Sequence, residues 1–237
     1  MKNKTLWKQV GAAAIAAAMV MSTVPATPVQ AAGGKTLAVS SQKQLNQALK
    51  TVKGKNAVIT VKAGKNVKIT IPKGTYKVTI RVVGKKAAVV NNGTVKEIVV
   101  NSKGTVAIKN NGTIKKVTVQ NAKSVSFSGN HKKAVPVVVN AEDVSMILAA
   151  PAKITAKKDV NIVLKKGAEK SSITCTKNVQ AQVDNQTKKA ISVKIADGTT
   201  LKVESGESCT ITPKGKKEDT SGEDKTDGKD QKTDDLS

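Results

Sequence analysis

Asn91-Asn92-Gly93-Thr94-Val95-Lys96 is repeated nineteen positions later as Asn110-Asn111-Gly112-Thr113-Ile114-Lys115. The likeness extends past the two hexapeptides, because Ile98 aligns with Val117 at the same offset. A repeat of about 20 residues with two or three short strands is typical of a solenoid, in which each coil is too small to fold alone. Coils stacked about 4.8 Å apart pair each strand with its copies above and below.

The chain on either side of this repeat, from Ala57 to Ile211, alternates apolar and polar residues with a period of two. Runs such as Val67-x-Ile69-x-Ile71 and Val160-x-Ile162-x-Leu164 are rich in β-branched residues, and Gly, Asn, Lys or Asp separate them. This pattern predicts short strands with Val and Ile pointing inward and Lys and Thr pointing outward. The segment has room for roughly eight coils of this length.

The spacing of the apolar residues favours one class of solenoid. Left-handed β-helices place an apolar residue at every sixth position, whereas Val106 and Ile114 are eight positions apart. We therefore expect an all-β fold, a right-handed parallel β-helix. A β-sandwich is the main alternative, and the regular period and the shortage of core aromatic residues weigh against it.

One helix is predicted ahead of the strands, over residues 40–51. Ser40 or Ser41 can cap its N-terminus, and Leu45 and Leu49 lie on one face. Such a helix can cover the open end of the core and block pairing of an edge strand with another chain.

The two ends of the chain have compositions of their own. The first 31 residues have the features of a cleavable secretory signal peptide: three lysines, a short apolar stretch and the small-residue site Val29-Gln30-Ala31. The expected organisation is a signal peptide (1–31), a lead-in with the capping helix (32–56), a β-helix (57–212) and a disordered tail rich in Lys and Asp (213–237). We expect a protein that is secreted or associated with the cell surface and not inserted in the membrane after cleavage, because the apolar stretch is too short to span a bilayer.

A helix with the sequence Ser41-Gln42-Lys43-Gln44-Leu45-Asn46-Gln47-Ala48-Leu49, followed by Val-rich coils, resembles the start of the pectate-lyase-like right-handed parallel β-helix superfamily. More narrowly, the chain looks like the lysine-rich exported β-helix proteins of Gram-positive gut anaerobes. The resemblance covers most of residues 40–211 and concerns architecture. It implies no catalytic, cofactor-binding or metal-binding residue at any position of this sequence.

The charge of the chain is strongly positive. It has 41 Lys and Arg residues against 17 Asp and Glu residues, a formal net charge of +24, and Arg81 is the sole arginine. Between residues 33 and 212 the imbalance is 32 against nine. Lysine coats favour salt-sensitive attraction to polyanions over bidentate readout. Two aromatic residues after the signal peptide, Tyr76 and Phe127, offer few stacking faces and argue against nucleic acid as the biological partner.

The nine acids between residues 33 and 212 are the candidates for a carboxylate active site. They are Glu97, Glu142, Asp143, Asp159, Glu169, Asp184, Asp197, Glu204 and Glu207. Only Glu142 and Asp143 are neighbours, and neighbours in a strand point to opposite faces. We therefore expect no catalytic site and no calcium site, and expect these acids to form turns and to pair with surface lysines.

Asparagine and histidine are the other candidate site residues. The repeated asparagines are expected to stack at a corner of the coil, where Asn-Gly tolerates positive φ, and not to bind a ligand; they are Asn91, Asn92, Asn110 and Asn111. His131 has no His or Cys at metal-ligand spacing, so we expect it in a solvated loop without a metal.

Cys175 and Cys209 are the only cysteines, and both occupy inward positions of the alternating pattern. Their separation of 34 residues is close to two coils, which would place them about 9–10 Å apart. That distance exceeds the reach of a disulfide, so two buried free thiols are expected, although export would permit a disulfide.

The sequence therefore predicts a non-enzymatic, exported solenoid that binds anionic cell-surface or extracellular polymers through a lysine-rich surface, with no cofactor. The alternatives are a polysaccharide lyase or hydrolase with an unrecognised site, and a spacer module that uses the rod for its geometry alone. If the lysines served only to keep a β-rich rod soluble, fewer positive charges would be enough and acidic residues would be tolerated among them.

Overall fold

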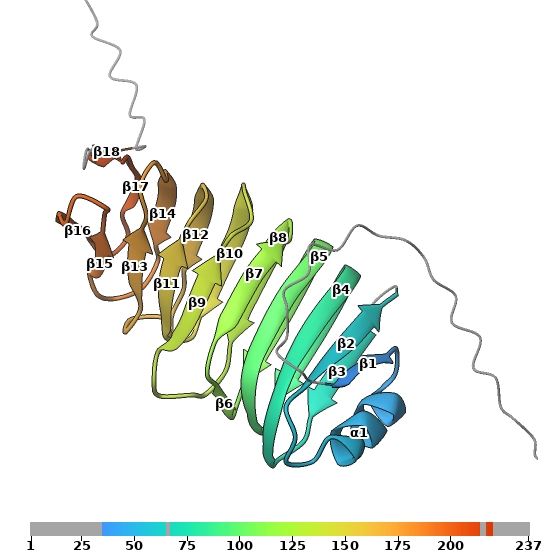
Figure 1. Cartoon of the computed structure of the whole chain (residues 1–237). Helices are drawn as coiled ribbons and strands as arrows, with labels where there is room; N and C mark the ends of the chain where they lie inside the picture. The colour runs from blue at the N-terminus through green and yellow to red at the C-terminus, as the bar shows by residue number, and fades with distance from the viewer. Residues whose placement is uncertain (1–34, 65–66, 214–216, 220–237) are drawn as a thin grey trace, which may run out of the picture. The chain divides into compact units, whose positions relative to one another are not determined.

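The strands of the computed structural model stack in register, one copy of the repeat above the next (Figure 1). The structure describes residues 35–64, 67–213 and 217–219. The predicted signal peptide (1–31) lies outside these residues, as does most of the predicted tail (213–237). The described chain is nearly all β, a parallel β-solenoid of about eight turns with one short helix near its start.

Each turn of the solenoid contributes one strand to each of two long faces. The first face consists of β1 (Lys35–Val39), β2 (Ala57–Ala63), the beginning of β4 (Thr75–Asn91), the beginning of β5 (Thr94–Asn110), β7 (Val117–Asn121), β9 (Val135–Val139), β11 (Ala152–Ala156), β13 (Ser172–Cys175) and β15 (Ile191–Lys194). The second face consists of β3 (Val67–Ile71), the ends of β4 and β5, β8 (Ser124–Ser128), β10 (Val144–Ala149), β12 (Val160–Leu164) and β14 (Ala181–Asn185).

Every pairing between these strands is parallel, which confirms the solenoid and excludes the β-sandwich. A sandwich would bury two antiparallel sheets against each other. Here the register places each strand over its counterpart from the neighbouring coil, as in the pairs Val82–Val100 and Val100–Val119. The strands are too short to be stable alone, so the ladder between coils supplies their hydrogen bonds.

The core consists of apolar residues stacked in columns. On the second face Val89, Ile108, Phe127, Leu148 and Leu164 follow one another in register, and each is almost fully buried. Between them the outward positions alternate with the inward ones, as the period of two predicts. Columns of similar side chains fill the narrow interior without large aromatic residues, which explains why Phe127 is the only ring in the core cluster.

The N-terminal end is closed by α1 (Gln42–Thr51). Ser41 caps this helix by accepting a hydrogen bond from the Gln44 N–H, and Leu45, Ala48 and Leu49 are buried against the core. Gln42 also completes the edge of β3: its Nε2 donates to the Thr70 carbonyl oxygen (2.8 Å), and the Thr70 N–H donates to its Oε1 (2.6 Å). The Gln42 amide thus makes the two hydrogen bonds at Thr70 that a neighbouring strand would otherwise make.

The C-terminal end changes from parallel to antiparallel pairing. β16 (Thr200–Val203) pairs with β15, β17 (Ser208–Ile211) with β14, and β18 (Lys217–Asp219) with β17. Residues 200–211, expected to form further coils, instead fold back on the last parallel strands. Residues 217–219, expected within a disordered tail, form a strand.

Asn185 gives a physical reason for this change. It occupies the position that follows Leu164 in the apolar column, and it is fully buried. Its Nδ2 lies within 3.0 Å of the carbonyl oxygens of Lys189, Val203 and Glu204, and its Oδ1 accepts hydrogen bonds from Thr187. A buried amide needs such partners, and here they come from the returning chain and from the adjacent turn, so the fold-back satisfies the polar group that ends the column.

Replacing Gln42 by Ala should lower the free energy of unfolding by about 1–3 kcal/mol, because the Thr70 N–H and carbonyl would lose their partner. Urea unfolding followed by circular dichroism measures the change. Gln47→Ala on the exposed side of the same helix is the matched control. Equal losses in the two variants would contradict the role assigned to Gln42.

Candidate functional site

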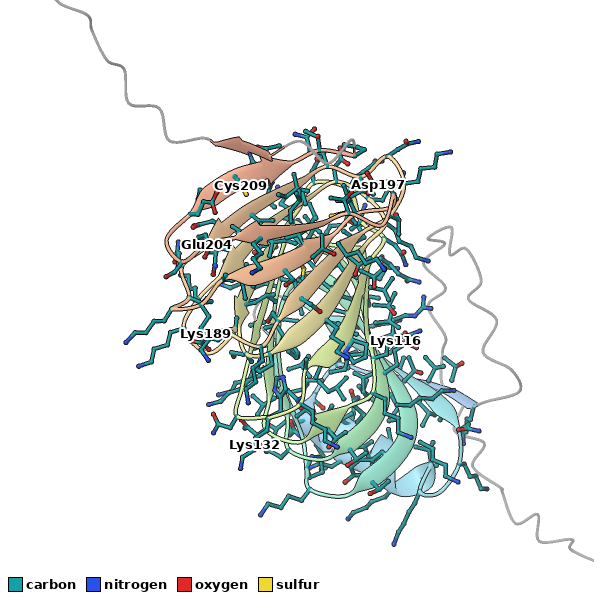
Figure 2. All side chains as sticks on the ribbon, turned by 90° about the vertical axis from the view of Figure 1, so that its left-hand side faces the viewer. Lys116, Lys132, Lys189, Asp197, Glu204 and Cys209 are labelled. Carbon is teal, nitrogen blue, oxygen red and sulfur yellow. The ribbon has the colours of Figure 1, made fainter. Side chains whose placement is uncertain are left out.

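The lysines of the solenoid gather on its edges, where the chain turns from one face to the other (Figure 2). The turns that lead from the second face to the first face, residues 72–77, 92–96, 111–116, 129–134, 150–151, 165–171 and 186–190, contain twelve exposed lysines and one acid, Glu169. Lys116 pairs with Glu97 of β5 at 3.0 Å. We call the other eleven lysines the lysine edge. They are Lys73, Lys77, Lys96, Lys115, Lys132, Lys133, Lys165, Lys166, Lys170, Lys188 and Lys189.

The opposite edge, where the first face leads to the second, is closer to neutral. Its described turns carry Glu142, Asp143 and Asp159 among their lysines. Lys158 pairs there with Glu142 at 2.9 Å, and the hydrogen bond to Glu142 raises the pKa of Lys158 above its ordinary value. On the lysine edge none of the eleven lysines forms an ion pair with a described acid. Of the two edges, the lysine edge therefore carries the larger excess of positive charge.

Register brings lysines of successive turns together on this edge. Tyr76, Val95 and Ile114 are aligned in a short third column that includes β6 (Thr113–Ile114). Lys96 and Lys115 follow Val95 and Ile114 directly and keep the offset of 19, so they lie one above the other at about the strand spacing of 4.8 Å. The register shifts between Tyr76 and Thr79, so Lys77 lies on the same edge without being aligned with them. Like charges at this spacing repel, and that repulsion is relieved by a bound anion.

The asparagine ladder lies at the start of the same turns. Asn91 and Asn110 are fully buried and in register, and Asn91 Nδ2 donates to Asn110 Oδ1 (2.9 Å). The exposed pair repeats this contact, since Asn111 Nδ2 donates to Asn92 Oδ1 (3.0 Å). The predicted corner stack is thus confirmed.

The reason expected for the Asn-Gly pairs was wrong. Neither Gly93 nor Gly112 has a positive φ. Glycine is needed there because the coils approach closely: a Cβ on Gly112 would lie 2.1 Å from the Gly93 carbonyl oxygen.

The repeat breaks at residues 129–134, which we call the His131 turn. Gly129 stands where the ladder would require a third asparagine, and the buried Asn110 Nδ2 has no hydrogen-bond partner among the described residues. The third column stops at β6, and the chain instead forms a longer turn. The only histidine of the sequence lies in this turn, and the only phenylalanine packs beneath it.

His131 is tied to two neighbouring turns and is not the solvated loop residue expected from the sequence. Its Nδ1 lies 3.2 Å from the Asn110 carbonyl oxygen and its Nε2 lies 3.0 Å from the Pro151 carbonyl oxygen. Its ring meets Phe127 edge to face, with 5.2 Å between the ring centroids. Both ring nitrogens therefore face acceptors, and only the protonated ring can donate to both.

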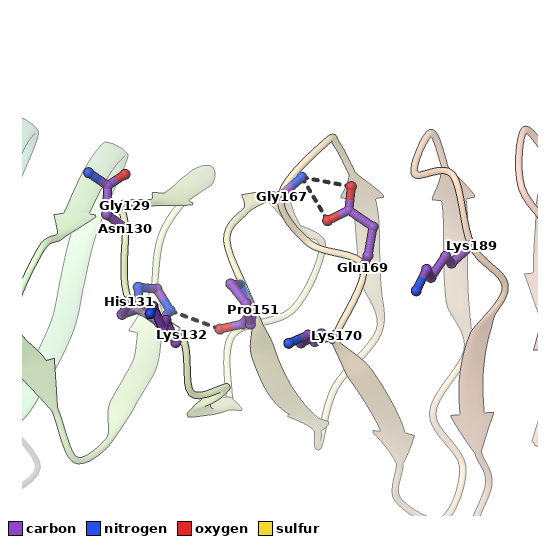
Figure 3. Close-up of a pocket in the computed structure, with 9 residues that line it drawn as sticks. All are labelled: Gly129, Asn130, His131, Lys132, Pro151, Gly167, Glu169, Lys170 and Lys189. Atoms are coloured by element: carbon purple, nitrogen blue, oxygen red, sulfur yellow. Dashed lines mark hydrogen bonds between the residues drawn. The ribbon is translucent and has the colours of Figure 1, made fainter.

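A hollow lies on each side of the His131 turn. The one shown in Figure 3, of about 280 Å³, is lined by Lys132 from this turn and by Lys170 and Lys189 from later turns. Lys170 and Lys189 extend from their turns toward His131. The other hollow, of about 320 Å³, is lined by Asn110, Lys132 and Lys133 and by no acid. Each hollow is large enough for one charged group of a ligand.

Glu169 is the only carboxylate that lines the hollow of Figure 3. Both of its oxygens accept a hydrogen bond from the Gly167 N–H, at 3.1 and 3.0 Å, and the carboxylate turns toward Gly167 and away from Lys170. This backbone hydrogen bond holds the pKa of Glu169 below its ordinary value, and nearby Lys166 and Lys189 act in the same direction. The acid therefore stabilises its own turn.

The other acids are distributed along the solenoid. Glu97 pairs with Lys116 at 3.0 Å, and Asp159 accepts the Gln180 N–H at 2.9 Å, as expected for pairing and turn formation. Glu142 and Asp143 lie in a turn between β9 and β10, with a positive φ at Asp143, and not in the strand that was assumed. Across the part of the chain that the structure describes, no three His, Cys, Asp or Glu side chains form a group that could hold a metal ion.

The two cysteines are buried and unbridged, as predicted, but the assumed geometry was wrong. Cys175 belongs to β13 on the first face, whereas Cys209 belongs to the antiparallel β17 beside β14. They are therefore not two coils apart in one column. Burial, and secondarily the charge of Asp159, raises the pKa of Cys175 to about 11.

Comparison with known proteins gives no relative. No protein-family model, no curated protein and no solved structure matches this chain. In the described residues, no helix has both the length and the apolar character needed to cross a membrane.

Replacing Glu169 by Gln should reduce the pH dependence of stability in the acid range. Since the folded pKa is lowered, the ionised carboxylate contributes stability above the ordinary carboxyl pKa, and this contribution is lost as the pH falls through the lowered value. Thermal unfolding at neutral and acid pH should show a less stable variant at neutral pH and a smaller difference in acid. Glu142→Gln on the opposite edge is the control, and a difference independent of pH would contradict the role of Glu169.

Both thiols should resist iodoacetamide at neutral pH in the native protein, because both side chains are buried and the raised pKa of Cys175 makes its reactive thiolate scarce. Unfolding in urea should expose them to complete alkylation. Mass spectrometry of the intact chain counts the labels, and a mass that rose on reduction alone would reveal a disulfide and contradict the structure.

Proposed function

We propose that this protein binds linear anionic polymers along the lysine edge, without catalysing a reaction on them. The observation that carries the proposal is the presence of twelve exposed lysines on one edge of the solenoid, eleven of which pair with no described acid. Seven stacked turns give this edge a length of roughly 29 Å, from the strand spacing. A linear polyanion can lie along it and contact one turn after another.

The choice of lysine favours this kind of binding. Lysine offers a hydrated point charge on a flexible stem, whereas arginine offers a planar fork for bidentate recognition, and Arg81 is the sole arginine. Many weak contacts of this type release counterions and make binding depend steeply on salt. The protein then recognises the charge density and linear form of the polymer. The flexible lysine side chains adjust to the positions of its anionic groups.

Export would place the protein among suitable polymers. With the predicted signal peptide (1–31), secretion or retention at the cell surface is part of the proposal. Teichoic acid, anionic mucin glycans and acidic polysaccharides are the candidate ligands. We also propose that the chain belongs to the pectate-lyase-like superfamily, and more narrowly to the lysine-rich exported β-helix proteins. This part of the proposal rests on resemblance of architecture.

A polysaccharide lyase or hydrolase is the competing function. A glycoside hydrolase needs a pair of carboxylates across the bond that it cleaves. The hollow of Figure 3 has one carboxylate, that of Glu169, which is bound to its own turn, and the hollow on the other side of the His131 turn has none. This arrangement favours binding over cleavage. A spacer module without affinity for polyanions is the remaining alternative.

Replacing Lys77, Lys96 and Lys115 together by Gln should weaken polyanion binding by about tenfold at low salt, because three charges of neighbouring turns are removed from the lysine edge. Isothermal titration calorimetry of the chain from Ala32 onward with dextran sulfate and with poly(glycerol phosphate) measures the affinity. Neutral dextran is the ligand control.

The matched control variant replaces Lys85, Lys103 and Lys123 on the opposite edge by Gln. It removes the same charge and should reduce affinity much less. Equal losses would assign binding to net charge alone and not to the lysine edge. A wild-type protein that binds neither polymer at low salt would overturn the proposed function.

A further inference from the structure

The His131 turn combines three departures from the repeat at one place. The asparagine ladder ends there, the third column ends there, and the only histidine of the sequence is inserted between two backbone carbonyls. Since local rules tend to be broken at functional sites, this turn is the strongest candidate for a specific subsite on an otherwise regular edge.

The contacts of His131 fit the protonated ring. A neutral ring can donate to the Asn110 carbonyl or to the Pro151 carbonyl, and its other nitrogen then places a lone pair against an oxygen. The protonated ring donates to both. Protonation therefore strengthens the link between three turns and adds a positive charge beside the hollow of Figure 3.

The charged groups around His131 are mostly cations. Lys132 and Lys133 belong to the same turn, and Lys170 and Lys189 face it across the hollow. The turn that contains Asn110 and Gly112 contributes no titratable group to the lining, and neither does Pro151. Glu169 is the one acid, and its carboxylate is bound to the Gly167 N–H. The cluster thus carries several cations and lacks a free counter-charge.

We infer that the hollow lined by Lys132, Lys170 and Lys189 is an oxyanion subsite, in which the binding of one sulfate or phosphate group is coupled to protonation of His131. Lys170 and Lys189 come from successive turns, about one strand spacing apart, so one anionic group can contact both, with Lys132 on the far side of the hollow. Because both ring N–H groups are used by carbonyls, His131 acts through its charge and not through contact with the ligand. The inference rests on the proposed function and adds a defined site and a pH response to it.

The coupling is reciprocal, so it can be measured from either side. An anion in the hollow should shift the half-protonation of His131 to higher pH, and protonation should tighten anion binding by the same factor, about fivefold for a typical coupling between sites. The ordinary pKa of lysine lies several units above the range in which histidine titrates. A change of affinity there therefore reports on the histidine.

The sole histidine allows a direct experiment. The ring Cε1–Hε1 signal of the chain from Ala32 onward, free of any histidine tag, is followed by NMR through a pH titration at constant ionic strength. The titration is repeated with dextran sulfate, with poly(glycerol phosphate) and with neutral dextran. We expect the half-protonation pH to rise with one or both anionic polymers and not with neutral dextran; the polymer with the larger shift identifies sulfate or phosphate as the preferred group.

Three variants separate the subsite from the rest of the edge. His131→Gln keeps a donor for one carbonyl but not the change of charge, so its affinity should no longer vary with pH. The double variant Lys170→Gln, Lys189→Gln keeps the imidazole ring of His131, and its affinity should also no longer vary with pH. The triple variant at Lys77, Lys96 and Lys115 should bind more weakly yet keep the fivefold pH dependence. Circular dichroism checks that each variant is folded.

The outcomes distinguish this inference from the proposed function. If the wild-type protein binds the polymers but the His131 signal titrates identically with and without them, the subsite is refuted and polyanion binding stands. The subsite is likewise refuted if His131→Gln retains the pH dependence. If no anionic polymer binds at low salt at any pH, the proposed function fails and the subsite fails with it.

Discussion

The hydrogen-bonded ladder between successive coils is the constraint on which this structure depends. Each strand is four or five residues long in most coils and has no stability of its own, so its backbone groups must pair with the coil above and the coil below. Parallel pairing then aligns equivalent positions of the repeat at about 4.8 Å. Whatever residue occupies a position is brought next to its own copies.

This alignment has different consequences inside and outside. Inside, Val89, Ile108 and Phe127 stack as an apolar column, and Asn91 and Asn110 stack as a hydrogen-bonded pair, so repetition is stabilising. On the edge, the same alignment stacks lysines, and repetition is repulsive. The fold tolerates this because the turns are solvated, and a surface of aligned, unpaired cations is well suited to a linear polyanion. The constraint that builds the core therefore also builds the proposed binding surface.

The points where the ladder is interrupted are as informative as the regular turns. At the N-terminal end Gln42 supplies a side-chain amide in place of a strand, and at the C-terminal end Asn185 replaces an apolar residue and gathers the returning chain. At the His131 turn the interruption lies in the middle of the solenoid, where no end has to be closed. An interruption that closes nothing needs another explanation, and an oxyanion subsite coupled to the charge of His131 supplies one.

The parallel solenoid, the capping helix, the inward Val and Ile, and the corner stack of asparagines were predictable from the sequence, because each follows from a short periodic pattern read at its own position. The stacking of Lys96 and Lys115 also follows once the period near 19 is recognised, whereas the register shift beside Lys77 does not. The contacts of His131 were not predictable, because its partners are backbone carbonyls 20 and 21 residues away, and a carbonyl leaves no trace in the sequence. The antiparallel pairing of the C-terminal strands, which include Cys209, was not predictable either. An alternating apolar and polar sequence is compatible with both parallel and antiparallel pairing. Alternation and repeat length thus determine which residues are buried and which recur, whereas the turns decide strand direction, and only their tertiary contacts bring His131, Lys170 and Lys189 to one hollow.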